Sequence, residues 1–593
     1  MTIHAERRRP AVNAELLRRI GLVFGMIAVL LIVIKIPAIR ELRFPGPDDT
    51  LRMVEVRDLI AGQGWFDLHM HHVDAIHGGV PMHWSRLVDI PLAAVILLLR
   101  PLLGQPHAEL AAMIFVPLMT FGFAIFLAGR IAWRLLNEEA TTFACLALAL
   151  SVPAVSQMQP LRVDHHGWQI VTALAAVNGL MARTPRIGGW IIGLSLAVWL
   201  SISVEGLPLS AAIVGITALR WLRREEDKVW LVTTMQALAG GSVMLFLATR
   251  GFADLAIHCD QISPVHLAIF GWGALALTAL GALRPHPRAF TLIGFGVVGL
   301  GAAALVWFAA PQCVGGGFVT LDPLVRTYWY SNVAEGQPVW HQSMKDLLQV
   351  VVPPAVGLWA SIKLALRSHD WLRRWWIEYT LLLAAALAVA VFVTRAGAVA
   401  GALAAIPLGW QITEWIRAAR SLRRPGRRAL ALAGVGVVLV PAMPVTLLTM
   451  AMPAQAKIIE KYPPQMTDCH IALAAPALRR LPAGEILAPL DIGPDLIYQT
   501  PLTVVATGHH RGAKAMHEVI AAFIGSPEYA HALLSERGTS YVALCPDFAE
   551  PTIYMHHAPN GFAAQLVKGK VPDWLEPIAM APGTDLRIWK VKD

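Results

Sequence analysis

Asp164, His165 and His166 form a run of three side chains that can bind metal ions, directly before an apolar segment that begins at about Trp168. A carboxylate and imidazoles at the start of a helix suit a divalent cation or an anionic substrate. Arg162, two residues earlier, adds a cation that can bind phosphate. We therefore expect Asp164 and His166 to be metal ligands, and Arg162 and His165 to contact an anionic substrate.

Two further carboxylates, Asp48 and Asp49, follow the turn-forming sequence Pro-Gly-Pro at residues 45–47. Residues 50–60 have the apolar periodicity of a helix, so the two acids stand at its start. One interpretation is that they cap the N-terminus of this helix. The other is that one of them is a general base and that Asp49 is a metal ligand.

Arg395 and Glu335 are the remaining candidates. Arg395 follows an apolar run, in the sequence FVTRAGAVAG. An arginine at that position either extends its guanidinium to the membrane surface or contacts a lipid-linked phosphate. Glu335 lies in the sequence SNVAEGQP, where a single acid predicts nothing by itself.

The composition predicts the kind of protein that carries these residues. Hydrophobic residues make up 56% of the chain and charged residues 15%, whereas a soluble domain carries about 25% charge. Apolar runs long enough to cross a bilayer of roughly 30 Å recur up to about residue 452. The net charge of +9 does not indicate nucleic-acid binding, because the arginines lie in short loops between the apolar runs. We expect about thirteen spans, at residues 18–39, 109–134, 140–158, 168–183, 187–204, 206–222, 229–249, 264–283, 289–310, 347–367, 373–395, 397–417 and 429–452.

The basic loops predict the orientation. Short cytoplasmic loops are rich in Lys and Arg, which places the arginine-rich N-terminus in the cytoplasm. An odd number of spans then puts the C-terminal part outside. Residues 88–103 are apolar but contain Asp89 and Arg100, and a span there would reverse the orientation of the next basic loop. We therefore expect an amphipathic or re-entrant helix on the outer face. The membrane domain is expected at residues 1–453, with long outer loops at 40–107 and 311–346.

Residues 454–593 have the composition of a soluble domain, with an α/β pattern of strand-like EILAPLDIG and TSYVALC and helix-like AKAMHEVIAAFI. Because the outside is oxidising, we expect the disulfides Cys259–Cys313 and Cys469–Cys545. The alternative is that these cysteines are small buried apolar residues. The histidines of the first outer loop lack paired cysteines or an HExxH helix, so they do not favour a zinc site.

In their order along the chain, these motifs resemble the GT-C glycosyltransferases, and within them the catalytic subunits of oligosaccharyltransferases. That family has an Asp in the first outer loop, followed by an Arg-apolar-apolar-Glu pattern, and here Asp49 precedes RMVE at residues 52–55. Asp164-His165-His166 is similar to the DHH motif of its archaeal members. SNVAEGQP resembles the family's SVSEHQP-like segment and places Glu335 on its glutamate, and Arg395 resembles the arginine that contacts the donor pyrophosphate.

The resemblance implies a glycosyltransferase of the bacterial inner membrane that moves a sugar or glycan to an acceptor on the periplasmic face. The donor would be a polyprenyl-phosphate or polyprenyl-diphosphate sugar, contacted by Arg395. A divalent metal, Mg²⁺ or Mn²⁺, would be held by Asp49, Asp164, His166 and Glu335. Asp49, Asp48 or Glu335 would act on the acceptor.

One family motif is missing, because the C-terminal domain contains no WWDYG sequence. In the family this motif recognises the Ser or Thr of the protein sequon, so its absence argues against Asn glycosylation of proteins. The alternative functions are a transporter or flippase of lipid-linked glycans, whose ionisable residues would line a path through the membrane, and a membrane scaffold without catalysis.

Overall fold

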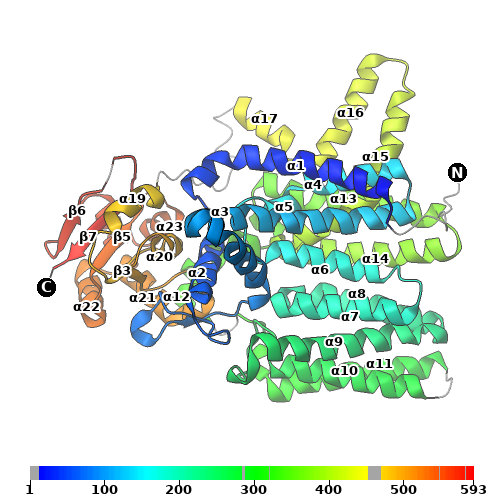
Figure 1. The fold of residues 1–593 in the computed structure, drawn as a ribbon, viewed down its shortest axis with the longest axis horizontal. Coiled ribbons are helices and arrows are strands. Elements are labelled where there is room, and N and C mark those ends of the chain that lie inside the picture. The colour runs from blue at the N-terminus through cyan, green and yellow to red at the C-terminus, as the bar shows by residue number, and fades with distance from the viewer. Residues whose placement is uncertain are drawn as a thin grey trace.

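The computed structural model describes residues 12–283, 287–318, 321–451, 469–546, 548–580 and 582–592. Long helices run side by side through most of the molecule, and the smaller C-terminal part lies at one end of this bundle (Figure 1). The predicted domain boundary between residues 453 and 454 falls outside the described residues. The first arginines of the chain, the centre of the basic loop at 284–288 and the end of the last predicted span also fall outside them.

Every predicted span corresponds to one helix or to one bent pair of helices. The first pair, bent by 67°, is α4 with the short helical turns at residues 152–158, and the second, bent by 99°, is α16 with α17. The helices are α1 (Ala14–Glu41), α3 (Arg86–Leu135), α4 (Glu138–Leu150), α5 (Val152–Val155), α6 (His166–Gly179), α7 (Pro185–Ile202), α8 (Leu207–Arg223), α9 (Lys228–Thr249), α10 (Pro264–Ala282), α11 (Arg288–Ala309), α13 (Met344–Arg367), α14 (Asp370–Phe392), α15 (Gly397–Arg420), α16 (Pro425–Leu439) and α17 (Met443–Ala451).

Most of these helices have the length and composition of a membrane span. Within the described residues, nine helices meet both criteria, or eleven if each bent pair forms one span. The two other predicted spans, α6 and α8, have 14 and 17 residues, fewer than the ~20 that a bilayer usually requires. The chain is therefore a helical protein with several apolar helices of spanning length, and the count of thirteen stays a prediction.

Close helix packing fixes α15 in the centre of the bundle, where nearly all of its length is buried. Small residues make this possible because they let two backbones approach each other. A Cβ atom added at Gly409 of α15 would lie 2.4 Å from the carbonyl oxygen of Ala140 in α4. A Cβ at Gly357 of α13 would lie 2.8 Å from Ala404 of α15. The segment that carries Arg395, at the start of α15, is thereby held in place.

The predicted first outer loop, residues 40–107, contains two helices and a small hairpin. They are α2 (Pro47–Ala61), the antiparallel strands β1 (His69–Met70) and β2 (Val80–Pro81), and the first arm of α3. Gly104 breaks α3 with φ 74° and ψ 165°, so residues 86–103 form a separate arm, as expected for residues 88–103. Arg52 of α2 is fully buried and forms an ion pair of 2.8 Å with Asp89 of this arm.

The C-terminal part contains a five-stranded sheet of order β4-β3-β5-β7-β6. β3 pairs in parallel with β4 and β5, whereas β7 is antiparallel to both β5 and β6. The predicted strand-like and helix-like segments match β3, β5 and α21. The elements are α19 (Ile471–Leu478), β3 (Glu485–Leu487), α20 (Gly493–Gln499), β4 (Thr503–Val504), α21 (Ala513–Ile524), α22 (Pro527–Arg537), β5 (Tyr541–Leu544), α23 (Ala549–His557), α24 (Phe562–Val567), β6 (Leu575–Ile578) and β7 (Arg587–Val591).

This C-terminal part is attached to the first outer loop by hydrogen bonds. Val504 of β4 donates to the carbonyl of His72 at 3.0 Å and accepts from the backbone N–H of Asp74 at 2.9 Å. Thr50, at the start of α2, donates to Asp495 at 2.8 Å. The disulfides Cys259–Cys313 and Cys469–Cys545 are both present, which confirms the predicted pairing. The contacts through Thr50 place the C-terminal part beside the two acids that begin α2.

Candidate active site

Asp49 joins the start of α2 to the Asp164-His165-His166 segment. One of its carboxylate oxygens accepts hydrogen bonds from the backbone N–H groups of Val163 (2.8 Å) and Asp164 (3.1 Å). The other lies 3.1 Å from Nη1 of Arg162. The carboxylate is fully buried. Both carboxylate oxygens of Asp49 therefore already bind residues 162–164. This is the segment with which Asp49 was expected to hold a metal ion.

Neither acid of this pair caps the helix. The N-cap residue of α2 is Gly46, and it makes no side-chain capping bond. The capping interpretation is therefore wrong, although both acids lie in the first turn, where the helix dipole stabilises negative charge. Asp48 is only partly buried. Burial, together with the nearby negative charges of Asp164 and Glu335, raises the pKa of Asp48 to about 7.

Asp164 and His166 are held at the start of α6. Asp164 Oδ1 accepts from the backbone N–H of His166 at 2.8 Å. Asp164 Oδ2 lies 3.1 Å from Arg162 Nη2 and 3.7 Å from His166 Nε2, but it accepts no well-aligned hydrogen bond. Although burial opposes it, the Arg162 guanidinium and the two imidazoles hold the pKa of Asp164 well below its usual range. Asp164 is therefore a buried anion with one oxygen left open.

Glu335 and Arg395 reach the same place from two other segments. Glu335 lies in the helical turn Ala334–Gly336, between α12 (Pro323–Tyr328) and α13, and Arg395 lies in the turn Thr394–Ala396, between α14 and α15. Glu335 Oε1 is 3.9 Å from His166 Nε2 and 3.5 Å from Arg395 Nη2. The structure thus brings the acids of three loops, the imidazole of His166 and the guanidinium of Arg395 together.

Glu205 is a site residue that the sequence did not assign. It lies in the turn Val204–Gly206 between α7 and α8, and its Oε1 is 2.5 Å from Arg395 Nη1. Although burial raises it, the Arg395 guanidinium and the nearby imidazoles lower the pKa of Glu205 to about 2. No motif surrounds this residue, so only the fold could reveal that it shares Arg395 with Glu335.

His165 presents a neutral imidazole beside these groups. Burial and the adjacent His166 lower the pKa of His165 to about 3. Its Nδ1 has no hydrogen-bond partner. A neutral imidazole can give one hydrogen bond to an anion, so His165 is placed to contact an anionic substrate as a donor rather than as a positive charge.

The donor set suits a divalent cation. Asp164 Oδ2 is a buried carboxylate oxygen without a hydrogen bond, and Glu335 is partly exposed nearby. His165, His166 and Glu205 form a second possible group, whose ligand atoms lie within 4.8 Å of one another. Gln169 donates to Nδ1 of His166 and accepts from the indole of Trp199, which leaves the ring proton on Nε2. For His166 to bind a metal through Nε2, the Gln169 amide must turn round.

The comparisons with known proteins give a fold. No family model matches the sequence, and no curated protein matches it. The Archaeoglobus fulgidus oligosaccharyltransferase, solved in complex with an inhibitory peptide and a dolichol-phosphate, has a TM-score of 0.62 at 12% identity and covers 97% of this chain and 74% of its own. The same enzyme tethered to an acceptor peptide has a TM-score of 0.63 at 12% identity, with the same coverage. The chain has the GT-C fold.

A third structure of that enzyme, in complex with Zn and sulfate, gives a TM-score of 0.57 at 14% identity, and covers 92% of this chain and 70% of its own. The predicted resemblance of this GT-C chain to oligosaccharyltransferase catalytic subunits is confirmed at the level of the fold. The likeness extends over the helix bundle and the C-terminal part together, since it covers nearly the whole chain.

Proposed function

We propose that this chain is a membrane glycosyltransferase that moves a sugar or glycan from a polyprenyl-phosphate or polyprenyl-diphosphate donor to an acceptor on the periplasmic face. The observation that carries the proposal is the meeting of Asp164, Glu335 and Arg395. These residues come from three connections between helices, and His166 and Arg395 lie 3.9 Å and 3.5 Å from one oxygen of Glu335. Such a mixture of carboxylates and guanidinium suits a reaction in which a phosphate leaves.

Arg395 is the proposed contact to the donor phosphate. Its guanidinium is shared between Glu205 and Glu335, so a phosphate could replace one of these carboxylates. Arg162 and His165 would add further donors to the same anion. The structurally similar archaeal enzyme was solved with a dolichol-phosphate, which supports a lipid-linked donor here.

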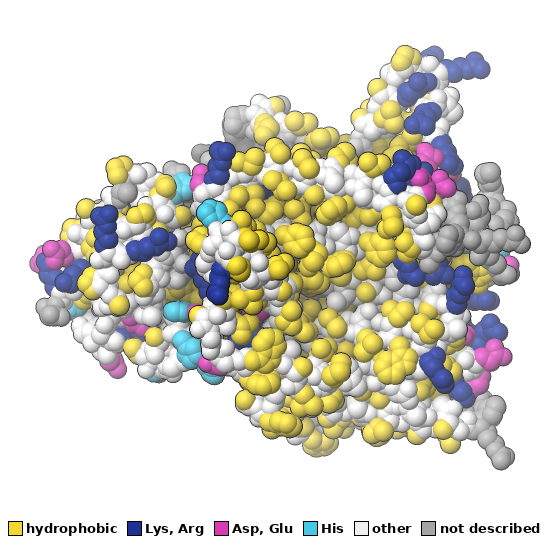
Figure 2. Space-filling view, in the orientation of Figure 1, with side chains coloured by type: hydrophobic (Ala, Val, Ile, Leu, Met, Phe, Trp, Pro, Cys, Tyr) yellow, Lys and Arg dark blue, Asp and Glu magenta, His cyan; other side chains and the backbone are white. Residues whose placement is uncertain are grey.

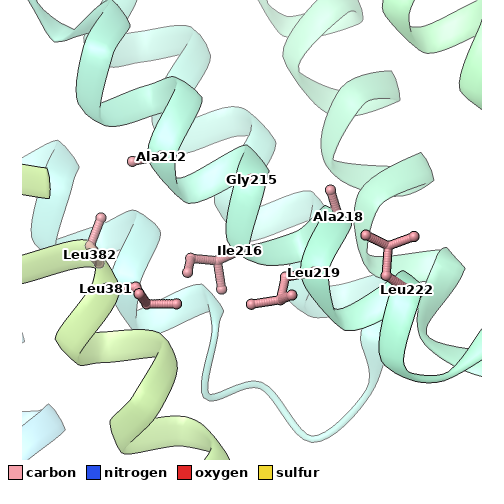
Figure 3. A pocket seen from close by; sticks show the side chains of 8 residues that line it. All are labelled: Ala212, Gly215, Ile216, Ala218, Leu219, Leu222, Leu381 and Leu382. Carbon is pink, nitrogen blue, oxygen red and sulfur yellow. The ribbon is translucent and has the colours of Figure 1, made fainter. Parts of the chain in front are cut away.

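A groove in the bundle offers a place for the lipid tail of that donor. It has a volume of about 380 Å³ and is lined only by apolar side chains and a glycine of α8 and α14, among them Ile216 and Leu382 (Figure 3). α8 begins two residues after Glu205, and α14 ends three residues before Arg395. The residues that line the groove lie in the middle of α14 and in the middle and far part of α8, so the groove would hold a distal part of the tail of a donor whose phosphate binds at Arg395.

Asp164, Glu335 and His166 would hold a divalent metal, Mg²⁺ or Mn²⁺, with Glu205 as a further carboxylate. When bound, such an ion neutralises the charge that develops on the leaving phosphate. The similar enzyme was solved with Zn and sulfate, which supports the binding of a divalent cation and of an anion here. Asp49 was predicted to be a metal ligand, but its engaged oxygens favour a positioning role, in which it fixes the backbone of Val163 and Asp164.

Asp48 is the proposed base. It is partly exposed, and its raised pKa lies near neutral pH, where a base works best. It would take the proton of the acceptor as the acceptor attacks the sugar carbon. The bond from that carbon to the phosphate oxygen breaks, and Arg395 receives the leaving phosphate. Glu335 would orient the acceptor or share its proton.

The distribution of charge supports the proposed orientation. Figure 2 shows dark blue Lys and Arg side chains gathered at the end of the bundle opposite the C-terminal part, with a yellow hydrophobic band between the two ends. Because cytoplasmic loops are rich in Lys and Arg, this end would face the cytoplasm of a bacterial inner membrane. The N-terminus would then be cytoplasmic, and the domain at residues 454–593 would be periplasmic.

A deletion strain tests this proposal. Complementation with Asp48→Asn, Asp164→Asn or Glu335→Gln should fail to restore the glycan product, although each variant reaches wild-type levels in the membrane. His77→Ala, in the first outer loop, should restore it and serves as the control. If the three variants restore the product, the site is assigned wrongly. If the intact lipid-linked donor accumulates on the inner face, the transporter takes the place of the enzyme.

A further inference from the structure

Three histidines from distant parts of the chain form a compact group that the proposed transfer does not use. His83 lies between β2 and α3, whereas His509 and His510 lie between β4 and α21. Each offers one ring nitrogen, and these nitrogens all lie within 4.8 Å of one another. We propose that His83, His509 and His510 bind a zinc ion that joins the C-terminal domain to the membrane domain. This inference is independent of the proposed function.

The rings already face one another as ligands of one ion would. His83 Nδ1 is 2.9 Å from His509 Nε2. The centroids of the three ring pairs are 5.0, 4.9 and 5.0 Å apart. Two nitrogens bound to a tetrahedral zinc at 2.0–2.1 Å are about 3.3 Å apart. Movements of a few tenths of an ångström would therefore open the His83–His509 pair enough to admit the ion.

Burial distinguishes this group from the other histidines of the first outer loop. His69 and His71 are about half exposed, and both pair with the exposed carboxylate of Asp67. His509, in contrast, is only 4% exposed, and its Nδ1 has no hydrogen-bond partner. The nitrogen that faces His83 is the other one, Nε2. Because the ring is enclosed, Nε2 stays directed towards His83, where the ion would bind.

Asp260 supports His510 as carboxylates commonly support metal-bound histidines. His510 Nε2 lies 2.6 Å from Asp260 Oδ2. A carboxylate on one ring nitrogen orients the ring and leaves its other nitrogen free for the metal. Arg511 binds both oxygens of the same carboxylate, at 2.8 and 2.7 Å, and shares its charge. The group therefore offers neutral nitrogens, which suit zinc, rather than the oxygens that magnesium and calcium prefer.

A zinc ion bound by the three histidines would stabilise the contacts between the segments around them. Asp260 follows Cys259, whose disulfide to Cys313 anchors the loop that leads towards Glu335. Within that loop, Phe318 contacts the ring of His510 with centroids 4.9 Å apart. A zinc ion here would join the first outer loop to the C-terminal domain, and the loop that leads towards Glu335 packs against one of the joined rings.

Metal content of the purified full-length protein in detergent tests the proposal. We would use Asp164→Asn as the background, to weaken metal binding at the other candidate site. After dialysis against a weak chelator and addition of zinc alone, this protein should retain one zinc per chain. His509→Ala and His83→Ala should each lose it, Asp260→Asn should bind it about 10- to 100-fold more weakly, and the exposed His77→Ala and His556→Ala should bind it as before.

Cobalt provides a second readout that does not depend on any variant. Co²⁺ in place of zinc should give the intense visible absorption of a tetrahedral, nitrogen-rich site, and added zinc should remove it. The proposal is overturned if the Asp164→Asn protein retains no zinc and shows no such absorption. It is also overturned if His509→Ala and His83→Ala, eluting as the wild type does in gel filtration, retain the full zinc content.

Discussion

Two groups of polar residues lie near the junction of the helix bundle and the C-terminal domain, and they differ in the atoms that they offer. The catalytic cluster, defined as Asp48, Asp49, Asp164, His166 and Glu335, consists mostly of carboxylates. The histidine cluster, defined as His83, His509 and His510, offers ring nitrogens. Oxygen ligands suit magnesium or manganese, whereas nitrogens suit zinc. We therefore propose different metals for the two sites.

The two clusters also differ in access. The Glu335 side chain is 38% exposed and lies in a loop between helices, so a substrate can reach the catalytic cluster. His509 is buried, and Asp260 and Arg511 hold the adjacent His510. A cluster that substrate can reach, with carboxylate and imidazole groups, suits catalysis. An enclosed cluster suits a structural metal ion. The difference shows that burial alone does not identify a catalytic residue, because both clusters contain buried ionisable groups.

The largest expected effect concerns the catalytic cluster. Asp164→Asn and Glu335→Gln keep the size of the side chain but remove its charge, and should each lower the transfer rate by at least about 10²–10³-fold. Glu226→Gln is the matched control, because its side chain is 81% exposed and pairs with a surface arginine. Rates would be measured in membranes with equal protein levels. Near-normal rates for both cluster variants would place the reaction elsewhere.

A smaller effect is expected at Arg395. Arg395→Lys keeps the charge but loses the planar fork that contacts Glu205 and Glu335. A charge-assisted hydrogen bond contributes about 1.5–3 kcal/mol, so the KM for the lipid-linked donor should rise roughly 10- to 100-fold. Steady-state kinetics with varied donor would show it. An unchanged KM with a reduced kcat would mean that Arg395 does not bind the donor in its ground state.

With metal binding at the catalytic cluster weakened by Asp164→Asn, zinc should stabilise the protein only through the histidine cluster. At a zinc concentration 100 times the Kd, a site specific to the folded state adds about 2.7 kcal/mol of stability. The melting temperature of the chelated Asp164→Asn protein should therefore rise on adding zinc, and that of the same protein with His509→Ala should stay constant. Equal shifts in both proteins would assign the effect to another site and would remove the contrast between the clusters.

The smallest expected effect concerns a third group, the carboxyl groups of Asp491 and Glu550 in the C-terminal domain. Burial, together with Asp491, raises the pKa of Glu550 to about 8, and burial raises that of Asp491 to about 6. The folded state thus holds protons that the unfolded state loses at about pH 4–5. This contribution to stability is complete below about pH 4 and is lost as the pH rises towards 8.

Glu550→Gln should reduce that pH dependence. The amide oxygen can accept from the backbone N–H of Asp491, and the amide NH2 can donate to the hydroxyl oxygen of Tyr554. The variant should therefore be more stable than the wild type at pH 8 and should lose this advantage near pH 5. Melting temperatures at the two pH values would test this. A variant whose stability falls equally at both would show that the pair does not titrate in this range.

The sequence predicted most of the bundle because hydrophobic length and basic loops are local signals. Each predicted span lies on one helix or on one bent pair of helices, and the predicted surface segment is an arm of α3 that ends at Gly104. The two disulfides were predicted because their four cysteines fall in segments that were expected to lie outside. The strands β6 and β7 were not predicted. β6 is a short edge strand that contains Glu576 and Pro577, and Pro in particular is rare within strands.

The candidate site was predicted in part. Motif order identified Asp164, His166 and Glu335, which the fold brings together. The engagement of Asp49 by two backbone N–H groups was not visible in the sequence, because it depends on the contact between α2 and the segment before α6. The meeting of His83 with His509 was also hidden, since these residues are separated by 426 positions and join only when the C-terminal domain docks.

The central claim is that the catalytic cluster transfers a glycan from a lipid-linked donor, and purified protein in liposomes tests it most directly. Liposomes made from a whole envelope extract, which holds both the polyprenyl-linked sugars and the glycan acceptors, would be incubated with the wild type or with Glu335→Gln, and the lipids analysed by mass spectrometry. We predict that the wild type releases the polyprenyl-phosphate or polyprenyl-diphosphate carrier when a divalent metal is present, and that chelator or the variant prevents this. Passage of the intact donor to the opposite leaflet, with no carrier released, would contradict the account and indicate a transporter.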